Sequence, residues 1–209
     1  MKNRWRIPAL LVCLVLVSAV SLAAEPQYDM RKVVWGMTMN EVLMAETQAT
    51  YDCAYPDSLF YRDVLICDYF PALLFYSFNN NRLAGAAYFF DEIQYTDKNL
   101  YLLSYDVLKQ ALIQKYGMPK TDIKDWLNPL FRNDTKNWGY AIGVGHLIYK
   151  TSWITHRTSI TLDLRTRQTF AWVDGRDLCK VVSGISLAIT YQSKEFYRKQ
   201  TIQSNPSDL

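Results

Sequence analysis

The chain has 209 residues, of which 23 are Lys or Arg and 20 are Asp or Glu, so its formal net charge is +3. Three of the basic residues and none of the acidic ones lie in the first 23 positions, which leaves 20 positive against 20 negative charges. This balance argues against a partner that is a nucleic acid or an acidic membrane surface. The length suits one core or two small fused units.

Residues 1–23 have the pattern of an export signal. Basic residues at the start precede an apolar run over positions 8–20, and small residues follow at positions 21 and 23. We therefore predict cleavage near Ala23 and a periplasmic mature protein. Cys13 lies inside the apolar run, which argues against lipidation there. An uncleaved membrane anchor is the alternative, and no membrane insertion is expected after cleavage because no other segment is long and apolar enough.

The first elements after this leader form an abrupt strand-to-helix junction. Residues 32–35 favour a short strand, and Gly36 permits a sharp change of direction. Thr38 and Glu41 have the spacing of a capping box, which predicts a helix over residues 38–50. The free amides at this helix start could instead bind an anion, although Glu41 disfavours one.

Three strands are predicted next, over residues 64–69, 73–78 and 82–90, with an Asn-rich turn before the last of them. The small residues at positions 84–87 leave room for a bulky element, and a helix packed on the sheet is the expected occupant. Residues 51–63 are predicted to be a loop.

The longest predicted helix covers residues 97–116, where apolar residues recur along one face. Gly117 and Pro119 end it. A polar connector over 118–136 leads to a hairpin with strands at 138–149 and 153–165. A turn at Asp174–Gly175 precedes a last alternating strand over 185–191.

These elements predict an α+β protein made of two tandem helix-plus-antiparallel-sheet units, with the helices packed on one face of the sheet. Each unit would contain a helix followed by about three strands. The predicted organisation is a signal peptide over 1–23, a first unit over 24–95, a second over 96–193, and a short C-terminal helix and tail over 194–209.

Three cysteines remain after the leader. An oxidising compartment permits a disulfide, and Cys53 and Cys67 are close in sequence. We predict that they pair, which would stabilise the fold by about 3 kcal/mol, and that Cys179 is a lone thiol. Either of the other two pairings stays open. The absence of a C-x-x-C motif disfavours a thiol oxidoreductase.

No residues are predicted to be catalytic, and no metal or cofactor is expected. His146 and His156 could face each other and bind a metal if the hairpin turned near residues 150–151, but polar surface histidines are the preferred interpretation. The Gly143–His146 stretch lacks the lysine and the third glycine of a phosphate loop. The sequence contains neither G-x-S-x-G nor H-E-x-x-H.

The surplus of aromatic residues instead suggests a binding surface on a sheet face. Its predicted members lie in strands or next to the connector over 118–136, and each could alternatively belong to the core. They are Tyr76, Tyr88, Trp138, Tyr140 and Trp153.

Three stretches resemble a known group of proteins. They are W-G-M-T-x-x-E-V from Trp35, K-Y-G-M-P from Lys115, and W-x-T-x-x-T-x-I-x-L from Trp153. In them the chain resembles small exported bacterial proteins of uncharacterised families, whose fold is similar to the helix-plus-antiparallel-sheet units of the beta-lactamase-inhibitor-protein-like group. That group includes the SmpA/OmlA-type outer-membrane assembly lipoproteins. The resemblance implies a non-catalytic role in protein binding or envelope maintenance. This chain lacks the lipidation cysteine of the lipoprotein members.

The leading hypothesis is therefore a soluble periplasmic binding module for an envelope protein or a ligand. A periplasmic hydrolase with an unrecognised active site is the alternative.

Overall fold

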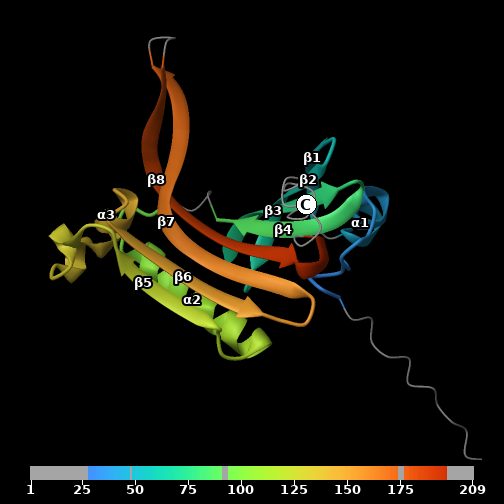
Figure 1. Ribbon diagram of the computed structural model, residues 1–209, viewed down its shortest axis with the longest axis horizontal. Coiled ribbons are helices and arrows are strands. Elements are labelled where there is room, and N and C mark those ends of the chain that lie inside the picture. Colours follow the sequence, from blue (N-terminus) through green and yellow to red (C-terminus); the bar gives the residue numbers. More distant parts are fainter. Residues whose placement is uncertain (1–27, 48, 91–93, 174–176, 197–209) are drawn as a thin grey trace, which may run out of the picture.

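The computed structural model describes residues 28–47, 49–90, 94–173 and 177–196 (Figure 1). Eight strands form one antiparallel sheet in the order β1-β2-β3-β4-β8-β7-β6-β5. The helices are α1 (Met39–Ala45), α2 (Leu100–Tyr116) and α3 (Trp138–Gly143), with short 3-10 turns η1 (Pro129–Phe131) and η2 (Thr135–Asn137). The strands are β1 (Thr50–Tyr55), β2 (Ser58–Ile66), β3 (Phe70–Asn79), β4 (Arg82–Phe89), β5 (Thr121–Trp126), β6 (Leu147–Ile154), β7 (Thr158–Val173) and β8 (Asp177–Ser193).

The prediction of two tandem helix-plus-antiparallel-sheet units is wrong. β4 and β8 pair directly, with Ala86 opposite Tyr191, so all the strands belong to a single sheet. The helices beside the sheet are short apart from α2, since α1 has 7 residues and α3 has 6. An unpaired strand edge is a template for another strand, and here the edge of β4 is satisfied by the last strand of the chain.

Several predicted boundaries are also corrected. β1 occupies part of the predicted loop over 51–63, and β5 lies inside the predicted connector over 118–136. Both are edge strands with mostly exposed residues, so neither shows the alternation of a half-buried strand. Residues 138–143 form α3 instead of a strand. The predicted strand over 32–35 is reduced to an isolated bridge between Met30 and Val33.

The local signals at the helix ends are confirmed. The Thr38 amide donates to Glu41 Oε2 at 2.7 Å, and the Glu41 amide donates to Thr38 Oγ1 at 3.4 Å, which is the predicted capping box. α2 ends at Tyr116, and Gly117 follows with a φ of 79°, in the left-handed region that favours glycine.

One face of the sheet is buried under α2 and the segment that runs from Met30 to α1. β3 shows the alternation clearly, because Leu74 and Tyr76 are fully buried while Leu73, Phe75 and Ser77 are only half-buried. On the buried face, the hydroxyls of Tyr105 in α2 and Thr151 in β6 lie 2.6 Å apart.

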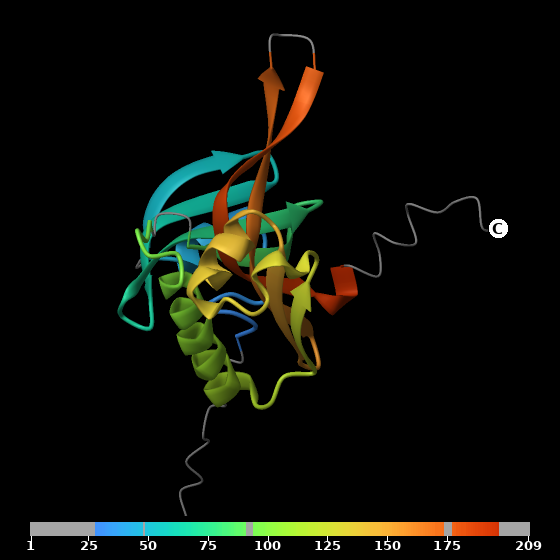
Figure 2. The same cartoon turned by 90° about the vertical axis from the view of Figure 1, so that its left-hand side faces the viewer.

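β7 and β8 are much longer than the other strands, with 16 and 17 residues. Their pairing continues beyond the sheet as a two-stranded ribbon, from Gln168 opposite Val182 to Val173 opposite Asp177. Both views show this ribbon rising past the other strands (Figure 1, Figure 2). The turn predicted at positions 174 and 175 lies outside the described residues.

A buried carboxylate ties the N-terminal segment to the sheet. Glu46 follows α1 and is only 4% exposed. Arg31 Nε donates to both of its oxygens, at 3.0 and 3.1 Å, and the Tyr76 hydroxyl donates to Oε1 at 2.6 Å. Burial, followed by the Glu46 charge, raises the pKa of Tyr76 far above its ordinary value, so this hydroxyl stays a donor at any physiological pH.

We expect Glu46→Ala to lower the free energy of unfolding by about 3 kcal/mol, because it leaves the Arg31 charge and the Tyr76 hydroxyl without their acceptor. Urea unfolding followed by tryptophan fluorescence measures this loss. Asp52→Asn is the control, since it breaks the Asp52–Arg62 ion pair, whose arginine side chain is 60% exposed. That change should cost less than about 1 kcal/mol. Equal losses in the two variants would contradict the assigned role of Glu46.

Glycine is required where α3 meets the start of α2. A Cβ on Gly139 would collide with the backbone of Lys98 and Asn99. Hydrogen bonds join the same two segments. The Gly139 amide donates to Asn99 Oδ1 at 2.7 Å, and Asn99 Nδ2 donates to the Lys136 carbonyl at 2.8 Å.

Gly139→Ala should therefore destabilise the protein by about 3 kcal/mol or more, because backbone atoms cannot move aside cheaply. Gly143→Ala in the same helix is the matched control. A Cβ there would meet only the Ile185 side chain, at an ordinary 3.7 Å. It should stay within about 1 kcal/mol of the wild type or gain stability, since alanine favours a helix. Thermal unfolding of the two variants tests the difference, and similar melting temperatures would refute it.

Candidate functional site

The candidate site lies on the sheet face opposite α2, here called the outer face. Strand register assigns to it Phe60, Phe75, Ala87, Thr190 and Thr161. Four rings form a continuous row over β1 to β4, here called the aromatic ladder. Its ring centroids are 5.6 Å apart for Tyr55 and Phe60, 4.9 Å for Phe60 and Phe75, and 6.3 Å for Phe75 and Phe89. These are the distances of favourable aromatic pairs.

The ladder is not core. Phe60, Phe75 and Phe89 are half-buried, and Tyr55 is 59% exposed. The neighbouring Leu65 is 58% exposed. Large apolar side chains that remain accessible side by side on one face are typical of a surface that contacts another molecule.

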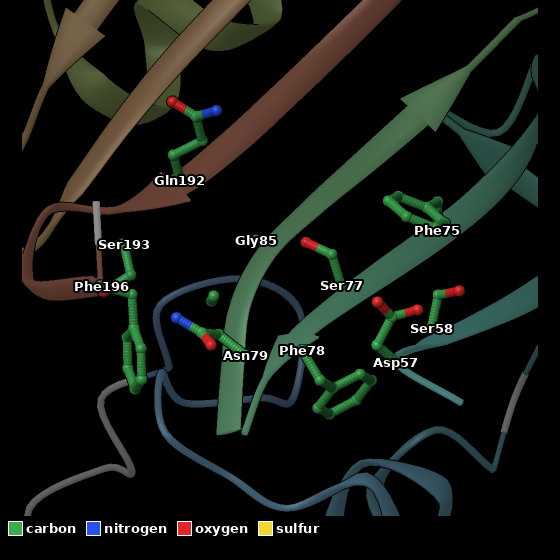
Figure 3. A pocket seen from close by; sticks show the side chains of 11 residues that line it. Asp57, Ser58, Phe75, Ser77, Phe78, Asn79, Gly85, Gln192, Ser193 and Phe196 are labelled. Carbon is green, nitrogen blue, oxygen red and sulfur yellow. The ribbon is translucent and has the colours of Figure 1, made fainter. Parts of the chain in front are cut away.

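A pocket of about 310 Å³ adjoins the ladder at Phe75 (Figure 3). In Figure 3, Ser77 and Ser58 lie on one side of it, and Gln192 of β8 and Phe196, which follows β8, lie on the other side. The complete lining consists of Asp57, Ser58, Phe75, Ser77, Phe78, Asn79, Ala84, Gly85, Gln192, Ser193 and Phe196.

Gly85 lines this pocket at a point where the neighbouring strands approach β4 closely. A Cβ there would lie 2.8 Å from Ser77 Oγ and 3.3 Å from the Tyr191 carbonyl oxygen, so the strand has no room for a larger residue. The small residues at positions 84–87 were expected to accommodate a helix. On the outer face Gly85 instead lines the pocket, while Ala86 faces Tyr76 and Tyr191 across the neighbouring strands.

The pocket is suited to binding more than to catalysis. Its serine hydroxyls and the amides of Asn79 and Gln192 can donate and accept hydrogen bonds, and its phenylalanine rings offer apolar walls. Among its described lining residues Asp57 is the one ionisable group. Neither His nor Cys is among these lining residues, and the one candidate base for the pocket's serines is the Asp57 carboxylate.

The residues predicted as a binding surface do not come together. Tyr76, Tyr88 and Trp153 are 0%, 6% and 2% exposed and belong to the core, while Trp138 and Tyr140 lie on α3. β3 has apolar residues on both faces, so the sequence did not reveal which alternate set was buried. The neighbouring residues Phe60, Phe75 and Phe89 were the missed ones.

Trp138 instead forms part of an aromatic cage around a lysine of the same chain. Lys124 Nζ lies 3.2 Å from the Trp138 ring centroid, 5.5 Å from that of Tyr149 and 6.0 Å from that of Trp126. Burial, followed by the charge of Arg132, lowers the pKa of Lys124. The cage joins the edge strand β5 to α3 through cation–π contacts.

The histidine pair predicted as a metal-site alternative is not formed. His146 precedes β6 and stacks on Phe131 at 5.7 Å, whereas His156 follows the other end of β6. The hairpin turns after Ile154, so the turn expected near residues 150–151 is wrong. Within the described ranges, no group of three His, Cys, Asp or Glu side chains could hold a metal ion.

The predicted disulfide is also not formed in the structure. Cys53, on β1, and Cys67, between β2 and β3, are both free thiols. The side chain of Cys179 lies outside the described residues.

Comparisons with protein-family models, curated proteins and solved structures find no match to this chain. None of the helices in the described part of the chain has the length and hydropathy of a transmembrane span. The outer face therefore has to be interpreted from its own geometry.

Phe75→Ala should lower the free energy of unfolding by about 1.5 kcal/mol, because the ring is only half-buried and its removal leaves an open depression. Phe90→Ala is the matched control, since Phe90 is 1% exposed. Its loss creates a closed cavity and should cost about 3–5 kcal/mol. Chemical denaturation compares them. A cost for Phe75 equal to that for Phe90 would show that the ladder is part of the core.

Proposed function

We propose that this protein is a non-catalytic binding module of the bacterial cell envelope, which holds a partner protein on its outer face. The observation that carries the proposal is the aromatic ladder, four accessible rings in one row beside a pocket with hydrogen-bonding walls. Tyr and Phe are enriched at protein interfaces, and an accessible cluster of this kind is stabilised when a partner excludes water from it.

The two parts of the site suit different parts of a partner. The rings of Tyr55, Phe60, Phe75 and Phe89 supply flat apolar contact area. The pocket next to Phe75 can receive one side chain of the partner, and its hydroxyls and amides can satisfy a polar end on that side chain. Apolar contact surrounding a well-packed anchor is the usual arrangement of a protein interface.

The export signal at residues 1–23 supports an envelope location, and the resemblance to the beta-lactamase-inhibitor-protein-like group supports a role in protein binding. The aromatic ladder favours binding over the hydrolase alternative, which would have to rely on Asp57 and a serine of the same pocket.

A photo-crosslinking amino acid at position 75 should give a discrete covalent adduct with a partner protein in living cells. The same amino acid at position 103 is the control, since Leu103 is 61% exposed but lies on α2, at the opposite side of the sheet. We expect no adduct from that position. Mass spectrometry of the adduct identifies the partner.

Phe60→Ala combined with Phe89→Ala should abolish the adduct at position 75 while far-ultraviolet circular dichroism stays unchanged. An adduct that survives this double substitution would mean that the ladder does not bind the partner. Equal labelling from positions 75 and 103, or none from position 75, would also refute the proposal.

A further inference from the structure

The pocket beside the aromatic ladder carries a negative charge on its wall. Asp57 belongs to the turn between β1 and β2, and its carbonyl accepts a hydrogen bond from the Phe78 amide at 2.8 Å, which holds this turn against the end of β3. The Asp57 carboxylate and the hydroxyls of Ser58 and Ser77 lie along one side of the pocket (Figure 3). Ser58 and Ser77 are cross-strand partners, so three side chains that can accept hydrogen bonds line one wall.

The described lining of this pocket contains no cation to offset the Asp57 charge. In the part of the chain that the structure describes, ion pairs engage the carboxylates of Asp29, Glu46, Asp52 and Asp122, but not that of Asp57. The lining therefore favours a cationic ligand group and disfavours a carboxylate, because complementary charges on the two sides select the partner.

The apolar walls of the pocket favour a flat cation. Phe75 and Phe78 contribute rings to the lining, and the Phe75 ring is the more accessible of the two. The face of an aromatic ring attracts a cation that lies over it. A guanidinium is planar and weakly hydrated, so it can stack on a ring while its N–H groups donate to a carboxylate. An ammonium is compact and strongly hydrated, and it cannot stack in this way.

We propose that this pocket binds a guanidinium group, and that the partner protein inserts an arginine side chain into it. The inference rests on the proposed function and adds the identity of the residue that anchors the partner. The guanidinium donates to the Asp57 carboxylate and to the Ser58 and Ser77 hydroxyl oxygens, while its plane packs on Phe75. The volume of about 310 Å³ is at the small end of the range of ligand pockets, which suits one long side chain.

Other anchor residues fit the pocket less well. An acidic side chain would be repelled by Asp57. An apolar side chain would remove water from the Asp57 carboxylate without supplying a donor, which is costly. A neutral amide would supply fewer donors and no charge. Arginine also belongs to the residue types that most often dominate the binding energy of protein interfaces.

Titration of the isotope-labelled protein with N-acetyl-arginine methylamide, followed by NMR, tests the pocket without the partner. Citrulline has the shape of arginine but an uncharged group in place of the guanidinium, so N-acetyl-citrulline methylamide is the matched neutral probe. We expect saturable shifts of the Asp57, Ser58 and Ser77 amide signals with the arginine probe, with a dissociation constant in the millimolar range. The citrulline probe should bind at least about fivefold more weakly, since it lacks the charge-assisted hydrogen bonds. N-acetyl-lysine methylamide should also bind more weakly than the arginine probe.

Asp57→Asn should weaken binding of the arginine probe by at least about fivefold and leave the affinity for the citrulline probe unchanged. Asp68→Asn is the charge-matched control, since Asp68 is exposed in the turn at the other end of β2 and does not line the pocket. Its affinity for the arginine probe should equal that of the wild type. In living cells, Asp57→Asn should lower the yield of the adduct at position 75 several-fold, whereas Asp68→Asn should not change it.

The inference is overturned if the citrulline or the lysine probe binds as tightly as the arginine probe, or if the affinity for the arginine probe survives Asp57→Asn. In either case an adduct at position 75 in the wild type would still support the proposed function. Absence of that adduct would refute the proposed function, while the probe titration would still decide whether the pocket takes a guanidinium. If Asp57→Asn does not fold, as judged by circular dichroism, the comparison of the three probes on the wild type decides.

Discussion

The architecture depends on the pairing of β4 with β8. The two strands come from the middle and the end of the chain, and their backbone hydrogen bonds merge two antiparallel meanders into one sheet. Small residues of β4 allow the neighbouring strands to approach on both faces of the sheet. Ala86 is small enough to sit between Tyr76 and Tyr191 on the buried face, and Gly85 lies against Ser77 and the Tyr191 backbone on the outer face. A continuous sheet gives the molecule one extended outer face, on which the aromatic ladder and its pocket lie.

The N-terminal segment is held against the buried face of this sheet by a few polar contacts as well as by apolar packing. Glu46 places a carboxylate among buried side chains, which is costly unless every oxygen has a donor. Arg31 and Tyr76 supply those donors. The Trp35 indole adds a hydrogen bond to Thr158 Oγ1 at 2.8 Å and so joins the N-terminal segment to the start of β7. The directional contacts therefore specify where this segment docks, while the apolar core supplies most of the driving force.

The parts of the fold that could be predicted from the sequence are those controlled by neighbouring residues. The capping box at Thr38 and Glu41 and the helix stop at Gly117 require only local geometry, and both are confirmed. The pairing of Gly85 with Gln192 joins residues far apart in the chain and left no local signal. β1 and β5 were missed because edge strands bury little of either face.

The candidate site was missed for a related reason. An alternating pattern identifies the buried face of a strand only when one set of residues is polar. In β3 both sets are rich in apolar residues, so Tyr76 and Phe75 were equally good candidates for an accessible surface. Burial under the Met30–α1 segment decides between them, and Glu46, which follows α1, contacts Tyr76 of β3 directly. Which face of β3 stays accessible thus follows from tertiary packing, which the sequence of a single strand does not encode.

The outer face combines two chemistries that are separated along the sheet. Aromatic rings occupy its β1–β4 half, while Lys150, Asp163 and Arg165 occupy its β6–β7 half. Between the halves stand small residues, Ala87 and Thr190, which are cross-strand partners. Apolar contact gives an interface most of its affinity, whereas charges mainly set orientation and the rate of encounter. A partner that covered both halves would therefore be held by the rings and oriented by the charges.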